Sequence, residues 1–440
     1  MKTNFLAQLY KIGVVGLFVS TSFLASCKQD APVGSTPTPT TTITSPIPKT
    51  PPQIIVPSDN KPLNLEAEIE LGRHLFYDKQ MSVDGSTSCA SCHQADRGFS
   101  DLLQTSRGMN GQMGTRNAPG LTNVAYNTVF TWDGKFPTLE KHAPGPIFNA
   151  VEMGNNFFTS GKDTIGNRDT TGGGYGSKVG TNDTLMLFAR LDGNPKVLPG
   201  TMVGATAMVD VNSVRKDKLG KNYYALLNAA WGPVTVTMST DRGTTFTKVE
   251  AVAFTMDIIA KSIAAFERTF ISNASPFDRY NSGDETAIND NAKNGFKLFI
   301  DTARANCVSC HSGYNFTDQQ FHNNGILQNS PNVDSKDIGR GAITKNSADN
   351  FKYKTPTLRN VSLTGPWMHN GTFANSGATV EISLENVVRH YNFGGHATPG
   401  QDPRVRQLHL SDDEVRDISM FLMTLQDGSF SSNSSLSNPW

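Results

Sequence analysis

The sequence predicts a mainly α-helical protein with two homologous domains in tandem. A Cys-x-Ser-Cys-His pentapeptide occurs twice in the 440 residues, at 89–93 and at 307–311. The segment before the first copy, Gly72-Arg-His-Leu-Phe-Tyr-Asp78, matches Gly295-Phe-Lys-Leu-Phe-Ile-Asp301 before the second. The match resumes after both copies, where Pro-x-Leu-x-Asn-Val occurs at 119–124 and at 356–361. A motif that returns with its flanks in the same order indicates an internal duplication.

Each pentapeptide has the pattern of c-type haem attachment. The two cysteines bond to the haem, and the histidine that follows binds the iron as its proximal ligand. We therefore expect two covalently bound haem c groups. A zinc half-site or a redox pair is the alternative, but it leaves the histidine at the same offset in both copies unexplained. The expected attachment residues are Cys89, Cys92 and His93 for the first haem and Cys307, Cys310 and His311 for the second.

The first 60 residues are predicted to export and tether the chain. Residues 1–26 combine early lysines with a short apolar run, which is typical of a secretory signal peptide. The run ends in Leu24-Ala-Ser-Cys27, which resembles a bacterial lipobox and predicts cleavage before Cys27 and lipidation of its thiol. An ordinary signal peptide is the alternative. Either route leads to the periplasmic or cell-surface side, and the lipid would anchor the protein to the membrane. Residues 27–60, rich in Pro and Thr, are expected to be a tether.

The two haem domains are expected at 61–275 and 276–427. Apolar residues recur at helical spacing in 66–76 and in 252–270, which predicts a helix in each. Ser411 and Glu414 form a capping box that predicts a helix reaching about Leu425. Residues 155–211, rich in Gly, Thr, Asn and Asp, are expected to be an irregular insertion in the first domain. Residues 428–440 are expected to be a frayed polar tail.

Charge and cysteine content bear on two further points, a nucleic-acid partner and a disulfide framework. The 39 basic and 39 acidic residues give a formal net charge of zero, which provides no indication of a nucleic-acid partner. Four of the five cysteines belong to the haem motifs, so no disulfide framework is expected.

Between about Leu63 and Leu425 the chain resembles the bacterial di-haem cytochrome c peroxidase family, which includes the MauG-type enzymes. The resemblance implies two mainly α-helical cytochrome c domains whose haems face a shared interface. It also implies that the N-terminal haem reacts with hydrogen peroxide, while the C-terminal haem receives electrons and passes them on. Besides the haem motifs, the matching segments are Leu71–Asp78, Arg116–Pro119, Trp132–Gly134, Glu152–Gly154, Tyr353–Asn360 and His369–Gly371.

At the first haem, the resemblance places Glu152 at the position of the family's distal catalytic glutamate. Peroxide cleavage needs a group that moves a proton between the two oxygens, and a carboxyl in an apolar surrounding has a suitably raised pKa. An exposed surface glutamate is the alternative. His142 occupies a second distal position, where it either acts on peroxide or is a solvated helix residue. Met109 stands where some members carry a removable distal histidine, and neither it nor Met113 is an obvious ligand. We therefore expect an open iron that needs no reductive activation.

At the second haem, Tyr391 matches the position of the distal ligand. Ordinary family peroxidases carry a methionine there, and MauG-type members carry a tyrosine. Tyr391 is thus the first choice of ligand and His390 the second; a Tyr391 that only packs against the haem edge is the third possibility. A phenolate oxygen stabilises ferric iron more than a thioether does.

The resemblance assigns roles to further residues at the domain interface. Trp132 matches a tryptophan between the two haems and is a candidate relay, although a large aromatic side chain there could simply be buried. Arg116 and Arg359 are candidates for pairing with haem propionates. The family also holds a calcium ion through oxygen donors. The matching calcium positions are Asn117, Thr364 and Pro366.

The leading interpretation is a cytochrome c peroxidase that reduces hydrogen peroxide with electrons from a small periplasmic donor, a cytochrome c or a cupredoxin. The second is a MauG-type oxidase that modifies a protein partner. Tyr391 favours the second, but Ala305 stands where MauG uses a surface tryptophan. The third is a non-catalytic di-haem electron carrier, which has no need of Glu152. A homodimer is left open.

Overall fold

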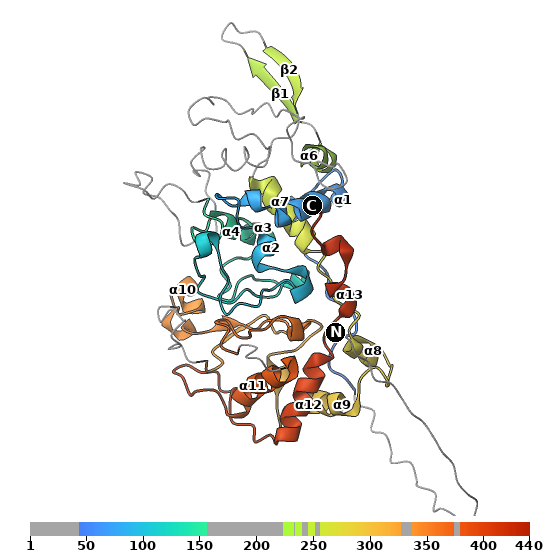
Figure 1. Ribbon diagram of the computed structural model, residues 1–440, viewed down its shortest axis with the longest axis vertical. Helices are drawn as coiled ribbons and strands as arrows, with labels where there is room; N and C mark the ends of the chain where they lie inside the picture. The colour runs from blue at the N-terminus through green and yellow to red at the C-terminus, as the bar shows by residue number, and fades with distance from the viewer. Residues whose placement is uncertain are drawn as a thin grey trace, which may run out of the picture. The chain divides into compact units, whose positions relative to one another are not determined.

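The computed structural model describes residues 44–155, 223–232, 234–239, 245–250, 256–326, 337–373 and 379–440 (Figure 1). The predicted signal peptide with Cys27, and the predicted insertion beyond Asn155, lie outside these ranges. Residues 45–440 form one compact unit. Within it, residues 61–275 are called the N-terminal half and 276–427 the C-terminal half. Across the described ranges, no helix combines the length and apolar character that a membrane crossing needs.

The N-terminal half is mainly helical, as predicted. Its helices are separated by long turns, and one antiparallel hairpin pairs Val234 with Glu250. The helix predicted over 66–76 is present with one more residue at each end, and Asn64 caps it by accepting from the Ala67 N–H. The elements are α1 Leu65–Tyr77, η1 Lys79–Met81, α2 Cys89–Cys92, η2 Ala95–Arg97, η3 Met109–Gly111, η4 Val124–Tyr126, α3 Leu139–His142, α4 Pro144–Phe148, α6 Tyr223–Trp231, β1 Val234–Ser239, β2 Thr245–Glu250 and α7 Met256–Glu267.

The C-terminal half repeats this plan. The predicted capping box is confirmed, since Ser411 and Glu414 exchange side-chain and backbone hydrogen bonds at the start of α12. The elements are α8 Pro276–Asn281, α9 Asp290–Ile300, η5 Cys307–Ser309, β3 Phe321–His322, α10 Arg340–Thr344, η6 Ser347–Asp349, β4 Tyr353–Lys354, η7 Val361–Leu363, α11 Val380–Asn392 and α12 Asp412–Met423. Two further elements, α13 Gly428–Ser431 and η8 Ser434–Leu436, follow this half.

The duplicated segment before each haem motif forms a helix that packs closely on a later one. Helix α1 packs on α7, and α9 packs on α12 (Figure 1). A Cβ on Gly72 of α1 would lie 1.8 Å from the backbone oxygen of Ser262 in α7. A Cβ on Gly295 of α9 would lie 1.9 Å from the backbone oxygen of Asp417 in α12. The shared glycine therefore allows the same close helix contact in both halves.

The end of the chain departs from the prediction. Residues 428–440 were expected to be frayed, but Phe430 and Leu436 are only 3% and 2% exposed and belong to the core of the N-terminal half. The Trp440 ring lies 4.8 Å from the His74 ring of α1, and the C-terminus lies beside α1 in Figure 1. The prediction was wrong because three apolar side chains, spread through a polar sequence, find a buried surface there.

The described part of the predicted tether also contacts both halves. Ile47 is 3% exposed, and its carbonyl accepts a hydrogen bond from Asn281 Nδ2 at 3.2 Å. Arg268 Nε donates to the Ile55 carbonyl, also at 3.2 Å. The segment 44–60 is therefore held along the haem domains.

Candidate haem and catalytic sites

The two predicted proximal histidines are oriented in the same way. His93 Nδ1 lies 2.8 Å from the Phe99 carbonyl oxygen, and His311 Nδ1 lies 3.0 Å from the Phe316 carbonyl oxygen. Because a carbonyl only accepts, Nδ1 carries the proton in each ring and Nε2 keeps its lone pair for a metal. Burial lowers the pKa of both histidines, which favours the neutral form that binds iron.

The thiols beside these histidines suit covalent attachment. All four are half-buried and unbridged by disulfides. Burial raises the pKa of Cys92 to about 11 and that of Cys307 to about 12, and it raises the pKa of Cys89 and Cys310 as well. Two neutral thiols next to a histidine with a free Nε2 fit a c-type haem in each half.

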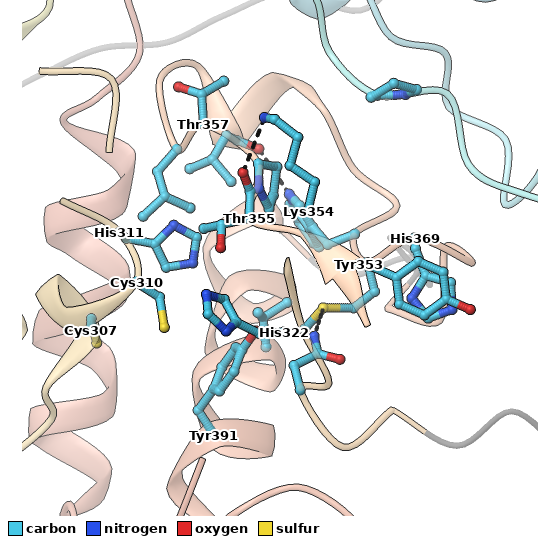
Figure 2. A pocket seen from close by; sticks show the side chains of 18 of the residues that line it. Cys307, Cys310, His311, His322, Tyr353, Lys354, Thr355, Thr357, His369 and Tyr391 are labelled. Atoms are coloured by element: carbon cyan, nitrogen blue, oxygen red, sulfur yellow. Dashed lines mark hydrogen bonds between the residues drawn. The ribbon is translucent and has the colours of Figure 1, made fainter. Parts of the chain in front are cut away.

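A large cavity surrounds the second motif and reaches Trp132 and His142 of the N-terminal half. Figure 2 shows His311, His322 and Tyr391 directed toward one another, with Cys307 and Cys310 at one side. Helix α11 supplies one wall through residues spaced three or four positions apart, which places them on one helix face. These residues are Leu384, Val387, Val388 and Tyr391. Such a largely apolar wall fits a porphyrin.

Tyr391, and not His390, faces this cavity. The Tyr391 hydroxyl oxygen accepts a hydrogen bond from Asn324 Nδ2 at 3.2 Å, and burial raises its pKa to about 12. His390 does not line the cavity, because its Nε2 donates to the Asn324 carbonyl at 2.9 Å. This arrangement supports Tyr391 as the first choice of distal ligand.

Glu152 lies near the first haem motif. Its charge raises the pKa of both Cys89 and Cys92, and burial raises the pKa of its own carboxyl. Asn149 Nδ2 donates to Glu152 Oε1 at 2.6 Å and so fixes the carboxylate. Glu152 is half-buried and hydrogen-bonded, which disfavours the alternative of a free surface glutamate.

The loop carrying Met109 packs against this glutamate. The Met109 N–H donates to the carbonyls of Val151 and Glu152. Gly154 has a φ of +70°, in the left-handed region that favours glycine, and its Cα lies close to the Met109 side chain. Met113 is 50% exposed. The open first iron stays a prediction.

His142 lies in a more enclosed position than a solvated helix residue. It lines the large cavity, and its ring centroid lies 6.2 Å from that of Phe130 and 5.4 Å from that of Phe136. Burial, with a smaller contribution from the charge of His93, lowers its pKa to about 4. His142 is therefore neutral near pH 7 and able to donate or accept a hydrogen bond.

Trp132 connects the two halves. Its indole Nε1 donates to the Asn117 carbonyl at 2.9 Å, and its own carbonyl accepts from the Lys354 N–H at 2.7 Å. The side chain is half-buried and lines the large cavity. This placement is compatible with a relay between haems, a role that stays a prediction.

The two arginines already hold carboxylates of the chain. Arg116 contacts Asp337 and Asp133, each at 2.7 Å, and Arg359 contacts both oxygens of Asp278, at 2.9 and 3.0 Å. Both guanidinium forks face carboxylates of the chain, and the propionate role stays a prediction.

The three predicted calcium positions all line the cavity. Asn117 Nδ2 donates to the Leu103 carbonyl, Thr364 Oγ1 donates to the Val361 carbonyl, and a cis peptide precedes Pro366. The calcium ion stays a prediction.

The sequence did not indicate three polar residues of the cavity: His322, Asn324 and Lys354. The two ring nitrogens of His322 lie 2.9 Å from Asp318 and Asp402. Lys354 is 7% exposed, and burial lowers its pKa to about 8. His322 and Asn324 lie outside every motif, and Lys354 lies in the matching segment Tyr353–Asn360 without an assigned role; the fold brings it to the other two. Among the described residues, Cys310, Asp318 and His322 place ligand atoms within 4.8 Å of one another, but Cys310 is expected to bond to the haem.

Comparisons with known proteins agree with this geometry. Residues 66–168 and 202–286 match the family described as di-haem cytochrome c peroxidase, and residues 292–426 match the cytochrome c family. The methylamine utilization protein MauG of Methylophilus methylotrophus is 30% identical over 382 residues, covering 86% of this chain and 88% of that protein. The cytochrome c551 peroxidase of Pseudomonas aeruginosa is 28% identical over 355 residues, covering 77% and 81%. The crystal structure of a MauG-like protein associated with microbial copper homeostasis aligns with a TM-score of 0.66 at 26% identity, covering 90% and 98%.

Proposed function

The chain belongs to the di-haem cytochrome c peroxidase family, and we propose that it is a peroxidase that reduces hydrogen peroxide to water. Two electrons and two protons convert one hydrogen peroxide into two waters. The proposal has the electrons enter at the C-terminal haem, from a small periplasmic cytochrome c or cupredoxin, and pass to the N-terminal haem. When bound, the two haems supply the redox-active iron.

The observation that carries the proposal is the fixed carboxyl of Glu152 beside the first haem motif. Burial raises its pKa, so it can hold and release a proton closer to neutral pH than an exposed glutamate can. Asn149 holds Oε1 at 2.6 Å, which leaves Oε2 to act on the substrate. Glu152 would move a proton from one oxygen of hydrogen peroxide to the other, so that the second leaves as water. A neutral His142 would orient the peroxide by a hydrogen bond.

The interface residues would support electron transfer. Trp132 is bonded to backbone groups of both halves, and such fixation lowers the reorganisation that accompanies electron passage. A calcium ion held through Asn117, Thr364 and Pro366 would fix the same interface. A lipid on Cys27 would keep the enzyme at the membrane, near its electron donor.

Steady-state peroxide turnover by the holoenzyme tests the proposal. Glu152→Gln keeps the shape of the side chain and removes its acid–base function, so we expect turnover to fall by about 10²–10⁴-fold. The absorption spectra of both haems should not change. Glu66→Gln, an exposed glutamate at the start of α1, is the matched control and should keep full turnover. A Glu152→Gln enzyme as fast as the wild type would refute the proposal.

A MauG-type oxidase is the second candidate, because Tyr391 lines the second haem cavity and a relative named MauG covers most of the chain. It would withdraw electrons from a protein partner in place of a small donor. A wild-type holoenzyme that consumes peroxide only when a specific protein is present would favour this candidate over the peroxidase.

A further inference from the structure

Asn324 contacts side chains that line the cavity beside the second haem motif. It follows β3 and lies 67 positions before Tyr391 in the sequence. Its Nδ2 lies 3.2 Å from the Tyr391 hydroxyl oxygen and 3.3 Å from the Met368 sulfur. All three side chains line the same cavity. One amide therefore contacts an oxygen and a sulfur that could each bind iron.

The direction of the hydrogen bond follows from the sulfur. A thioether only accepts, so the group of Asn324 that faces it is the NH₂ and not the carbonyl oxygen. The same NH₂ then donates to the Tyr391 oxygen. A hydrogen bond donated to an ionised acceptor is about twice as strong as one between neutral groups, so this contact favours the phenolate.

The backbone of Asn324 acts on the neighbouring residue. Its carbonyl accepts from His390 Nε2 at 2.9 Å and so keeps that nitrogen away from the cavity. Met368 is also constrained, because its φ of +75° lies in the left-handed region that a methionine rarely adopts. Asn324 thus contacts all three potential ligands near this face: Tyr391, His390 and Met368.

We propose that Asn324 is a positioning residue that holds the Tyr391 oxygen toward the iron of the second haem. Its amide donates to the ligand oxygen, and its carbonyl holds back His390. The inference rests on the proposal that Tyr391 is the distal ligand. Groups that hydrogen-bond to a metal ligand set its orientation and its donor strength. Asn324 would therefore influence the reduction potential of this haem without touching the iron.

The test compares holoenzyme variants by the ferric absorption and electron paramagnetic resonance spectra and by the midpoint potential of the C-terminal haem. Asn324→Leu keeps a similar side-chain size but donates no hydrogen bond, so the phenolate becomes a stronger donor and the potential should shift downward. Asn324→Gln retains a donor and should shift less. Met368→Leu removes the thioether that contacts the same amide, and it provides the background for a double variant with Asn324→Leu.

The remaining outcomes separate this inference from the ligand proposal. If Tyr391→Phe changes the ferric spectrum while Asn324→Leu changes neither spectrum nor potential, the inference is wrong and the ligand proposal stands. If Tyr391→Phe has no effect on the spectrum, both are wrong. A higher potential in Asn324→Leu that disappears when Met368 is also changed to Leu supports the inference, because the thioether has then replaced the released tyrosine. A higher potential that persists in the double variant overturns it.

Discussion

The two halves share a proximal side and differ on the distal side. Both orient the predicted proximal histidine through a carbonyl in a left-handed turn, with φ values of +58° at Phe99 and +51° at Phe316. Where we propose the distal groups, the N-terminal half has a fixed carboxyl, Glu152, whereas the C-terminal half has a phenol, Tyr391. The two copies thus share the predicted attachment residues and differ in the groups proposed to carry out the chemistry.

The reason for this difference is the distance along the chain. Each proximal histidine and the carbonyl that orients it lie within six positions of one another, so a short local sequence encodes both. The distal groups come from loops and helices much further on: Glu152 follows His93 by 59 positions, and Tyr391 follows His311 by 80. These distant segments can change without disturbing attachment.

The largest expected effect comes from removing one haem at a time. Cys89→Ser with Cys92→Ser should remove the N-terminal haem and abolish all reaction with peroxide. Cys307→Ser with Cys310→Ser should abolish turnover with an electron donor, while peroxide still oxidises the remaining N-terminal haem. Rapid-mixing absorption spectroscopy with peroxide measures both. If peroxide still oxidises the C-terminal haem of the variant that lacks the N-terminal haem, the proposed roles of the two haems are wrong.

Phe430→Ala should lower the stability of the N-terminal half, although Phe430 follows the C-terminal half in the sequence. The Phe430 ring centroid lies 5.8 Å from that of Phe99, whose carbonyl orients His93. Removing a buried phenylalanine costs about 3–5 kcal/mol, and the spectrum of the first haem should change more than that of the second. Denaturant unfolding measures the loss. Phe393→Ala, at a residue that is 71% exposed, is the control and should be nearly neutral.

Gly72→Ala and Gly295→Ala test whether the two helix contacts are equivalent. Each added Cβ would lie within 2 Å of a backbone oxygen, so the helices must separate, at a cost of about 1–3 kcal/mol. Thermal unfolding should show similar losses for both. Gly428→Ala, with no atom within 4 Å of the added Cβ, should be tolerated. A loss in only one half would show that the contacts have diverged.

A pH dependence of stability is also expected, and it comes from the N-terminal half. Burial raises the pKa of Glu267 to about 8, and Glu267 Oε2 has no hydrogen-bond partner among the described residues. The folded state therefore keeps a proton that the unfolded state loses near pH 4.5, so the free energy of unfolding decreases as pH rises from about 5 to 8. Glu267→Gln should flatten this slope, as measured by unfolding at several pH values. The exposed Glu285→Gln should leave it unchanged.

The sequence predicted what adjacent residues encode. The two haem motifs, the helix over 66–76 and the capping box at Ser411 all appear where expected, since each depends on local spacing. The environment of Tyr391 could not be predicted from the sequence, because Asn324 and Met368 are 44 positions apart and meet only in the folded chain. The prediction for residues 428–440 was wrong for the same reason. Phe430 and Leu436 stand in a polar sequence, and their burial depends on contacts with distant residues.

The packing of the tail determines when the first domain can be completed. Tyr77 of α1 donates to the Leu436 carbonyl and Arg73 donates to the Ser437 carbonyl, so residues 359 and 364 positions further along the chain surround the first helix. The N-terminal half therefore cannot complete its core before Phe430 and Leu436 have been synthesised and packed onto it. An affinity tag fused to Trp440 would consequently alter the domain that carries the first haem, and a tag for purification is better placed elsewhere.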